Sequence, residues 1–321
     1  MWHERDPGPM HQPVIAAVDP LREDIAPAAL GLMFARLTRR PLVLAAAYPV
    51  DLHVDGIYPE LTGAFREDVE EATCRFGGLV QLAPGPRVPV TTTVVPSAGF
   101  PASALHDLAE REKASLLVLG SSRRGPVGRV LPGAITDRLL HGAPCPVAVA
   151  PRGFSFENAD DGPRLIGVAY TDTPDGHAAL ARGCSLAARA RGLVRVLTVS
   201  EPLDPLITGG LEAVALGYVR PARDDTAATV LRRGLDAVSA GRSAGGEILT
   251  GRPADALAAA SHDLDLLVCG SRGYGPLRTL LLGGTSHALV RKAACPVLVV
   301  PSGSPADYAG PPRSDGHVVT G

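Results

Sequence analysis

The chain repeats itself at a constant offset of 150 residues. The segment from Gly120 to Gly153, GSSRRGPVGRVLPGAITDRLLHGAPCPVAVAPRG, aligns without a gap on Gly270 to Gly303, GSRGYGPLRTLLLGGTSHALVRKAACPVLVVPSG, and 14 of the 34 positions are identical. Solenoids and propellers repeat every ~20–50 residues, so a period this long indicates a duplicated domain. The 321 residues are also enough for two domains that each bury a core.

Apolar runs and helix-forming stretches alternate through both halves. Apolar runs bounded by turn residues predict strands, at Val14–Val18, Leu42–Ala47, Val90–Val94, Leu116–Leu119, Val147–Val149, Leu165–Val168, Val194–Val199, Glu247–Leu249, Leu266–Cys269 and Val297–Val300. Stretches with helical spacing lie between them, near Ala28–Arg39, Glu60–Phe76, Ala102–Lys113, Ile135–His141, Ala178–Ala190, Asp224–Ala240, Ala254–His262 and Thr285–Lys292.

This alternation is typical of parallel strands joined by right-handed helical crossovers. The predicted fold class is α/β, with two tandem Rossmann-like domains that each hold a five-stranded parallel sheet covered by helices on both faces. We expect domain 1 over residues 1–153, a linker over 154–163 and domain 2 over 164–303. Residues 304–321 are rich in Ser, Pro, Gly and Asp and are expected to form a disordered tail.

Composition argues against several functions. The net charge is −2, so no overall positive field attracts nucleic acid or an anionic membrane. We find neither a signal-peptide core nor an apolar run of the ~18 residues that a spanning helix needs, and we expect a cytoplasmic protein. The cysteines lack metal-binding spacing and are expected to be small buried side chains; they are Cys74, Cys145, Cys184, Cys269 and Cys295.

The loop after the fourth strand of the second half is the best candidate for a ligand site. In an open parallel sheet, ligands collect beyond the carboxyl ends of strands where strand order reverses, which selects the loops after strands one and four. Here Gly270, Gly273 and Gly283 are separated by two and nine residues, with Thr285 and Ser286 following. Such glycines let backbone N–H groups approach a phosphate, and the hydroxyls can cap the next helix. Tight strand–helix packing alone also accounts for glycines in such a turn.

The same loop resembles the ATP-binding motif of the universal stress protein family. The shared pattern is Gly, two residues, Gly, nine residues, Gly between a strand and a helix, followed by an Ala-Cys-Pro-Val strand. A turn typical of the family precedes the previous helix, at Gly251 in the second half and Gly99 in the first. The resemblance covers nearly all of residues 13–303. It implies a bacterial, non-catalytic protein with adenine nucleotide alpha hydrolase-like domains and ATP as ligand.

The two halves differ at the residue after strand one. The resemblance implies an Asp there that contacts the adenosine end of the nucleotide. The first half has Asp19, whereas the second half has Thr171, with Asp172 one position late. Replacing Asp by Thr removes at most one hydrogen bond to a charged acceptor, about 1.5–3 kcal/mol, so binding in the second half is weakened but not abolished.

The loops also depart from the motif. Where the family has Ser or Thr after the last glycine, the second half has Gly284, so Thr285 or Ser286 would have to supply the hydroxyl. The first half has Arg123 at the second glycine position and Ala134 after the last glycine. A left-handed backbone at an arginine costs roughly 1–2 kcal/mol, and the side chain would fill space meant for phosphate, although a guanidinium can also pair with phosphate. The second half is therefore the favoured site.

The predicted nucleotide-binding residues come from both halves. Those of the second half are Thr171, Asp172, Val199, Gly251, Gly270, Arg272, Gly273, Gly283, Gly284, Thr285 and Ser286, and those of the first half are Asp19, Gly120 and Gly133. No catalytic or metal-binding residue is predicted. Gly241 to Gly245 match G-x-S-x-G, but they follow a helix and lead into a strand, the reverse of a nucleophile elbow. No Walker lysine is present in these loops.

Three functional hypotheses follow. The first is a stress-response regulator in which ATP held by the second half alters the binding of unidentified protein partners. The second is an interaction scaffold that has lost nucleotide binding in both halves. The third, slow nucleotide hydrolysis, rests on fold analogy alone. The resemblance also implies that the last strands, Pro146–Ala150 and Pro296–Val300, pair to form an internal pseudo-dimer; assembly into a homodimer is left open.

Overall fold

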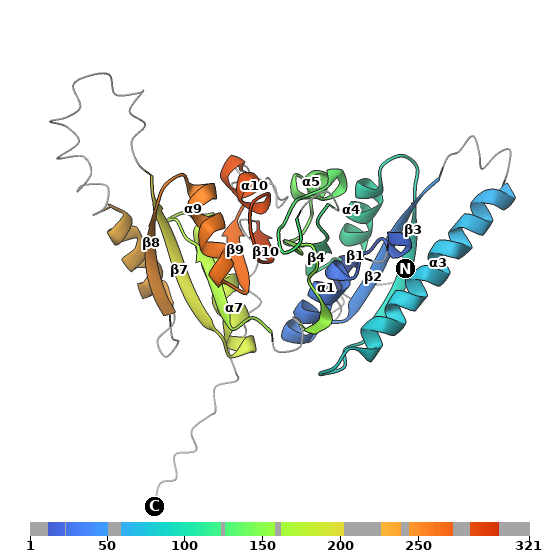
Figure 1. Ribbon diagram of the computed structural model, residues 1–321, viewed down its shortest axis with the longest axis horizontal. Coiled ribbons are helices and arrows are strands. Elements are labelled where there is room, and N and C mark those ends of the chain that lie inside the picture. The colour runs from blue at the N-terminus through green and yellow to red at the C-terminus, as the bar shows by residue number, and fades with distance from the viewer. Residues whose placement is uncertain are drawn as a thin grey trace, which may run out of the picture.

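The computed structural model describes residues 12–22, 24–50, 59–122, 126–157, 162–201, 226–238, 244–271 and 283–301. Within these ranges, ten strands form one sheet in the order β3-β2-β1-β4-β5-β10-β9-β6-β7-β8 (Figure 1). The strands are β1 (Val14–Ala17), β2 (Leu42–Pro49), β3 (Val90–Ser97), β4 (Leu116–Leu119), β5 (Val147–Val149), β6 (Leu165–Ala169), β7 (Leu193–Ser200), β8 (Ala244–Thr250), β9 (Leu266–Gly270) and β10 (Val297–Val300).

Helices connect the strands within each half, as the alternating sequence pattern predicts. They are α1 (Ala26–Thr38), α3 (Pro59–Leu82), α4 (Pro101–Arg111), α5 (Ala134–Leu140), α7 (Pro174–Ala190), α9 (Pro253–Ala260) and α10 (Gly284–Val290), with a further helix over residues 226–237. Short 3₁₀ turns, η2 (Pro20–Arg22) and η3 (Ser261–Asp263), follow β1 and α9.

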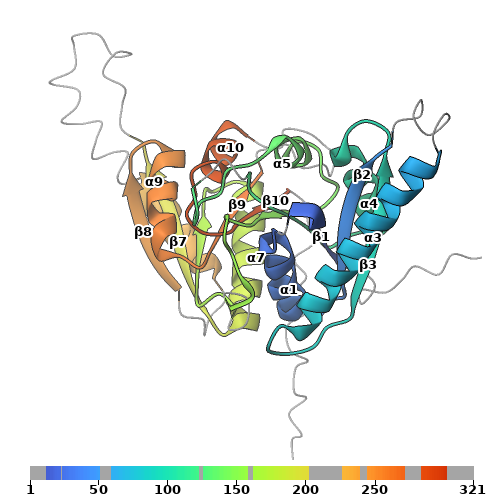
Figure 2. The ribbon, with the colours of Figure 1, turned by 45° about the vertical axis from the view of Figure 1, so that its right-hand side comes forward.

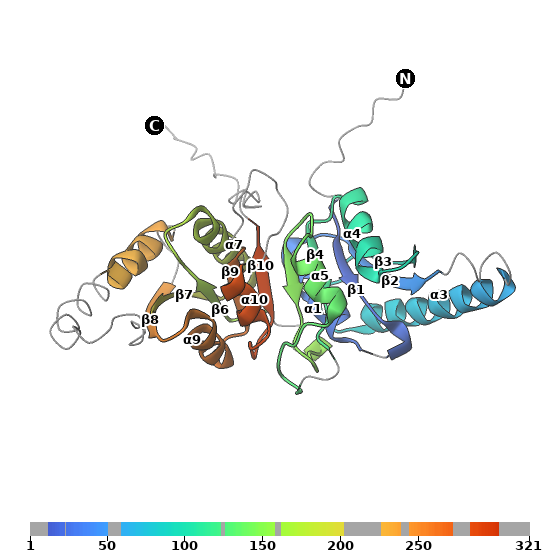
Figure 3. The same ribbon diagram turned by 90° about the horizontal axis from the view of Figure 1, so that it is seen from above.

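The two halves join through their last strands. All strand pairs within a half are parallel, whereas β5 and β10 run antiparallel, with Leu298 opposite Ala148. This is the predicted pairing of the final strands. From above, β10 lies near the centre of the molecule, with β8 and α3 toward opposite ends (Figure 3).

The central strands of the sheet are buried on both faces, whereas β8 at one end is mostly exposed. Val14 and Ala16 of β1 belong to a core shared with α1, α3 and α7, and Ile15 belongs to a second core shared with α4, α5, α9 and α10. Because successive side chains of a strand point to opposite faces, both faces need apolar residues, and the continuous apolar strands of the sequence meet that need.

Several elements are longer than the sequence predicted, among them α3 and β8, which each contain a glycine in close helix–strand contact. The predicted helix ends near Phe76, whereas α3 continues through Gly77, where a Cβ would lie 2.9 Å from Thr92 Cγ2 of β3. In β8, a Cβ at Gly246 would lie 2.9 Å from Leu235 Cδ1. Each glycine permits close helix–strand contact.

Several predictions fall outside the described part of the chain. They are the tail at 304–321, linker residues 158–161 and the loop residues Arg123, Arg272 and Gly273. Among the described helices, none combines the length and the apolar character required to traverse a bilayer.

Candidate functional site

A cleft of about 760 Å³ opens at the carboxyl ends of the second-half strands. It lies where β6 has its sequential neighbour β7 on one side and β9 on the other, which is the reversal of strand order that favours ligand sites. Residues predicted from widely separated parts of the sequence line this cleft: Thr171, Val199, Gly270, Thr285 and Ser286. The fold therefore gathers these predicted residues around one space.

Twelve further described residues line the cleft and were not among the predicted site residues. They are Ala169, Tyr170, Thr173, Pro174, Asp175, Gly176, Leu197, Glu201, Pro253, Leu257, Cys269 and Leu289. The start of α7, from its N-cap Thr173 to Gly176, directly follows the loop after β6. The expectation that ligands lie beyond the carboxyl ends of strands could therefore have placed this start beside the cleft. Leu257 and Leu289 face the cleft from α9 and α10, whose contributions depend on tertiary packing.

The glycine that ends β9 is required by packing. A Cβ at Gly270 would lie 2.7 Å from the backbone oxygen of Asp175 in the first turn of α7. In the first half, a Cβ at Gly120 would lie 2.9 Å from Pro27 Cγ in the first turn of α1. Both glycines therefore let a helix start approach the fourth strand of its half, whether or not a ligand is bound.

The hydroxyl of Ser286 ties α10 to β9. Its Oγ donates a hydrogen bond of 2.9 Å to the backbone oxygen of Gly270, and Thr136 Oγ1 donates an equivalent bond of 3.0 Å to Gly120 in the first half. Ser286 thus has a structural role that both halves share. Gly284 stands where the family has Ser or Thr. Because the Ser286 hydroxyl is already used, Thr285 is the remaining candidate for the hydroxyl that position 284 lacks.

Helix α10 begins without a side-chain cap. Gly283 is its N-cap residue, in an extended conformation with φ −70° and ψ 157°, and makes no side-chain hydrogen bond to the helix. The first N–H groups of a helix have no partner within the helix. Gly284 is the first residue of α10 and is exposed, and a Cβ built there would meet no heavy atom within 4 Å. Packing does not require this second glycine.

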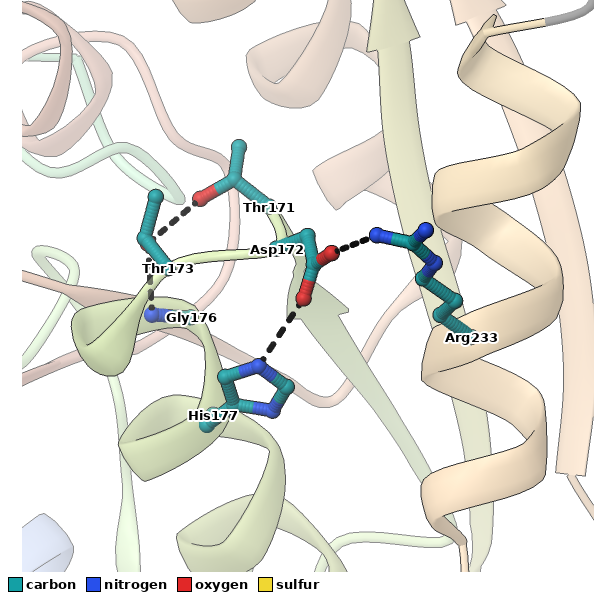
Figure 4. Close-up of polar contacts among 6 residues, drawn as sticks. All are labelled: Thr171, Asp172, Thr173, Gly176, His177 and Arg233. Atoms are coloured by element: carbon teal, nitrogen blue, oxygen red, sulfur yellow. Dashed lines mark hydrogen bonds and ion pairs between the residues drawn. The ribbon is translucent and has the colours of Figure 1, made fainter.

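Thr171 and Asp172 have separate roles (Figure 4). Thr171 lines the cleft, and its Oγ1 lies 3.0 Å from Thr173 Oγ1. Thr173 in turn caps α7, because its Oγ1 accepts a hydrogen bond of 3.2 Å from Gly176 N. Asp172 instead accepts a hydrogen bond from Arg233 on the helix at 226–237 and lies 3.0 Å from His177 Nε2.

The Asp172 contacts lower the pKa of that carboxyl, first through the Arg233 hydrogen bond and then through His177. Asp172 is not among the described residues that line the cleft. Its side chain joins the loop after β6 to two helices, while Thr171 occupies the position that faces the ligand space.

Two residues of this cleft have a buried polar atom without a partner. Within the described residues, five buried side-chain atoms lack a hydrogen-bond partner: Ser97 Oγ, Asp137 Oδ1, Tyr170 OH, Asp175 Oδ1 and Ser271 Oγ. Tyr170 and Asp175 line the cleft, and burial, followed by the charge of Asp172, raises the pKa of the Tyr170 hydroxyl. A buried polar group left unpaired costs about 1–3 kcal/mol, so these atoms lower the stability of the fold unless another group pairs with them.

The cysteine that lines the cleft has a thiol of low reactivity. Burial raises the pKa of the Cys269 thiol to about 12, so this cleft residue stays protonated at neutral pH. Cys145, Cys184 and Cys295 are also buried, as predicted, but the prediction is wrong for Cys74, which is exposed on α3.

No group of three or more His, Cys, Asp or Glu side chains suited to a metal ion occurs in the described ranges.

A second cleft, of about 650 Å³, occupies the equivalent place in the first half. All three predicted first-half residues line it, namely Asp19, Gly120 and Gly133. Ile135 stands where the second half has Thr285, and Ala134 stands where it has Gly284. The first-half cleft therefore lacks the threonine hydroxyl at this helix start.

Of the predicted second-half residues, Gly251, Gly283 and Gly284 are not among the described residues that line the cleft. Gly251 adopts φ +136° in the turn before α9, and Gly99 adopts φ +126° before α4. Only glycine reaches such angles without strain, so the shared turn has a backbone reason.

The fold and its paired clefts define a tandem Rossmann-like α/β protein. The sequence model of the "Universal stress protein family" matches this chain twice, over residues 10–151 and 163–301. The chain therefore belongs to the universal stress protein family, as a tandem member.

Relatives of known name agree with this assignment. One universal stress protein of Mycobacterium tuberculosis is 31% identical over 202 residues, which are 62% of this chain and 68% of that protein. A second one from the same organism is 28% identical over 303 residues, 89% of this chain and 96% of that protein. The crystal structure of a universal stress protein from Archaeoglobus fulgidus covers 91% of this chain and 99% of its own, with a TM-score of 0.63 and 18% identity, and so shares the fold.

Proposed function

We propose that this protein is a stress-response regulator that binds an adenine nucleotide, ATP, in the second-half cleft. The observation that carries the proposal is the convergence of Thr171, Val199, Gly270 and Thr285 on one cleft of about 760 Å³. This volume lies within the range of about 300–1,000 Å³ common for small-molecule sites. The mixture of apolar walls and a few polar groups is also typical of such sites.

The two ends of the cleft suit the two ends of a nucleotide. Val199, Leu197 and Leu257 provide apolar surface for a base, and the family resemblance assigns the place of Thr171 to the adenosine end. The uncapped start of α10 at Gly283 presents N–H groups and the positive end of the helix dipole, both of which favour phosphate.

We further propose that the nucleotide acts as an effector and is not turned over. Cys269, a nucleophile by residue type, has its thiol pKa raised to about 12 by burial. Covalent catalysis needs an activated nucleophile beside a base, and the described residues around the cleft offer no such pair. The expected output is a change in the affinity for a protein partner.

A matched pair of charge substitutions tests the site. Thr285→Glu places a carboxylate in the first turn of α10, where it favours the helix but repels phosphate, and Ile135→Glu makes the same change in α5. By calorimetric titration, ATP affinity should fall roughly tenfold or more for Thr285→Glu and stay at the wild-type value for Ile135→Glu. Equal affinities in all three proteins would remove the second-half cleft from consideration.

A scaffold without nucleotide is the second candidate. The charged described side chains that line the second-half cleft are both acidic, Asp175 and Glu201, and carboxylates repel phosphate. Mass spectrometry of small molecules released from the purified protein separates the two candidates. A released adenine nucleotide supports the regulator, whereas an empty extract together with no heat on ATP titration supports the scaffold.

A further inference from the structure

A groove of about 650 Å³ lies at the opposite edge of the sheet from the two clefts. It is formed by the end of α1, the connection between α3 and β3, and the end of α7, so both halves contribute. Figure 2 shows α1 and α7 side by side where the halves meet (Figure 2). Five of the residues that line the groove are arginines: Arg36, Arg39, Arg87, Arg189 and Arg191.

The positive charge in this groove is local. The whole chain carries a net charge of −2, yet none of the described residues that line the groove is acidic. Arg36 donates hydrogen bonds to the backbone oxygens of Pro86 (2.9 Å) and Ala83 (3.3 Å), and Arg189 donates one to Leu37 (3.4 Å). Arg36 thereby joins α1 to the connection between α3 and β3, and Arg189 joins α7 to α1. Arg39, Arg87 and Arg191 are exposed.

Arg39 and Arg191 hold equivalent positions in the two halves. Each is the C-cap residue of the first long helix of its half, and each has a left-handed backbone with φ 55°. Glycine adopts this conformation at lower cost. The two halves nevertheless both place a guanidinium there, and the fold brings the two groups to one groove.

The floor of the groove is apolar. Met33, Leu37 and Val88 line it together with Pro86 and Pro89. Guanidinium groups bind phosphate through paired, charge-assisted hydrogen bonds, and an apolar surface between them accommodates a ring or chain. The volume, within the ~300–1,000 Å³ of small-molecule sites, fits a compact ligand.

We propose that this arginine groove binds a small phosphorylated molecule with at least two phosphate charges, independently of the nucleotide clefts. A nucleic acid would need a basic surface that continues along its strand, whereas this patch is bounded by the two helix ends and the α3–β3 connection. An acidic peptide is disfavoured because the groove has an apolar floor and a volume suited to a small molecule.

Inorganic tripolyphosphate is the probe for this site. Calorimetric titration of the full chain should show one saturable site whose affinity falls with added salt. The double variant Arg39→Asn/Arg191→Asn should weaken binding by roughly tenfold or more. Asparagine is used because it tolerates the left-handed backbone, which keeps the helix ends intact.

Two controls separate this groove from other sites. Lys113→Asn removes a positive charge at the third non-glycine residue with a left-handed backbone in the described part of the chain, φ 49°. Lys113 is not among the described residues that line the groove, so this change should leave the affinity unchanged. Thr285→Glu should also leave it unchanged, whatever it does to ATP. The proposal is overturned if wild type shows no saturable binding, if Thr285→Glu rather than the arginine variant abolishes it, or if a 20-base single-stranded DNA binds the groove more tightly than tripolyphosphate.

Discussion

The two clefts share a frame but differ in the side chains that face the ligand space. Gly120 directly follows β4 and Gly270 ends β9, each under a helix start, and Thr136 and Ser286 donate the same hydrogen bond across the strand–helix junction. At the neighbouring helix position, however, the first half has Ile135 and the second has Thr285. The positions that hold the fold have stayed alike, whereas those that would recognise a ligand have changed.

The largest expected effect concerns the shared frame. Gly270→Ala would place a Cβ 2.7 Å from the backbone of Asp175, and overpacking of this kind costs about 1–3 kcal/mol. Gly120→Ala meets the ring of Pro27 and the Asp24 side chain, which have more freedom to move, so its cost should be lower. Urea unfolding of both variants measures the difference. Gly284→Ala, in open space, is the control and should change the free energy of unfolding by less than about 0.5 kcal/mol.

Exchange of the differing side chain tests the recognition claim. Thr285→Ile copies the first-half residue into the second half and removes a hydroxyl from the phosphate end of the proposed site. Because a hydrogen bond to a charged group is worth about 1.5–3 kcal/mol, ATP affinity should fall at least tenfold by calorimetry. If the reverse change, Ile135→Thr, gives the first half the affinity that the second half loses, one residue accounts for the whole difference between the clefts.

Restoring the family's hydroxyl should strengthen the second half. Gly284→Ser adds a side chain where a Cβ has no heavy atom within 4 Å, so the fold should tolerate it. One added hydrogen bond of about 0.5–1.5 kcal/mol predicts ATP binding that is roughly two- to tenfold tighter. Ala134→Ser is the matched change in α5. If Gly284→Ser folds normally but binds ATP more weakly, the phosphates do not lie at the start of α10.

The smallest expected effect is at Asp172, which pairs with Arg233 and His177. Its pKa is lowered in the folded protein by Arg233 and His177. The stabilisation is therefore present above the ordinary aspartate pKa and is lost as the pH falls through the lower folded value. Asp172→Asn should lower the melting temperature slightly at pH 7, and the difference from wild type should shrink toward zero in acid. A difference that grows as the pH falls would contradict this sign.

Local sequence patterns predicted the fold well because they report on burial. The ten apolar runs correspond to β1 to β10, and the 150-residue offset anticipated two halves of like topology. The same patterns ended α3 near Phe76 and began β8 at Glu247, whereas the structure carries these elements through Gly77 and Gly246. Their role is to let Thr92 and Leu235 approach closely, and no local pattern reveals which distant side chain a glycine will meet.

Tertiary structure also decided what each candidate site residue faces. Thr171 and Asp172 are adjacent in sequence, yet the first lines the cleft and the second pairs with Arg233, 61 residues away. Ser286 donates its hydroxyl proton to the backbone oxygen of Gly270, whereas Thr285 makes no such bond within the described residues and lines the cleft.

The sequence by itself determined that two similar α/β units exist and that each has a candidate turn beyond its fourth strand. It did so because strand burial, helix spacing and repeats are properties of neighbouring residues. Only the tertiary structure decided which polar groups remain unpaired at a cleft and that Arg39 and Arg191 meet in one groove. Those outcomes depend on which distant segments pack together, and packing follows from the whole fold.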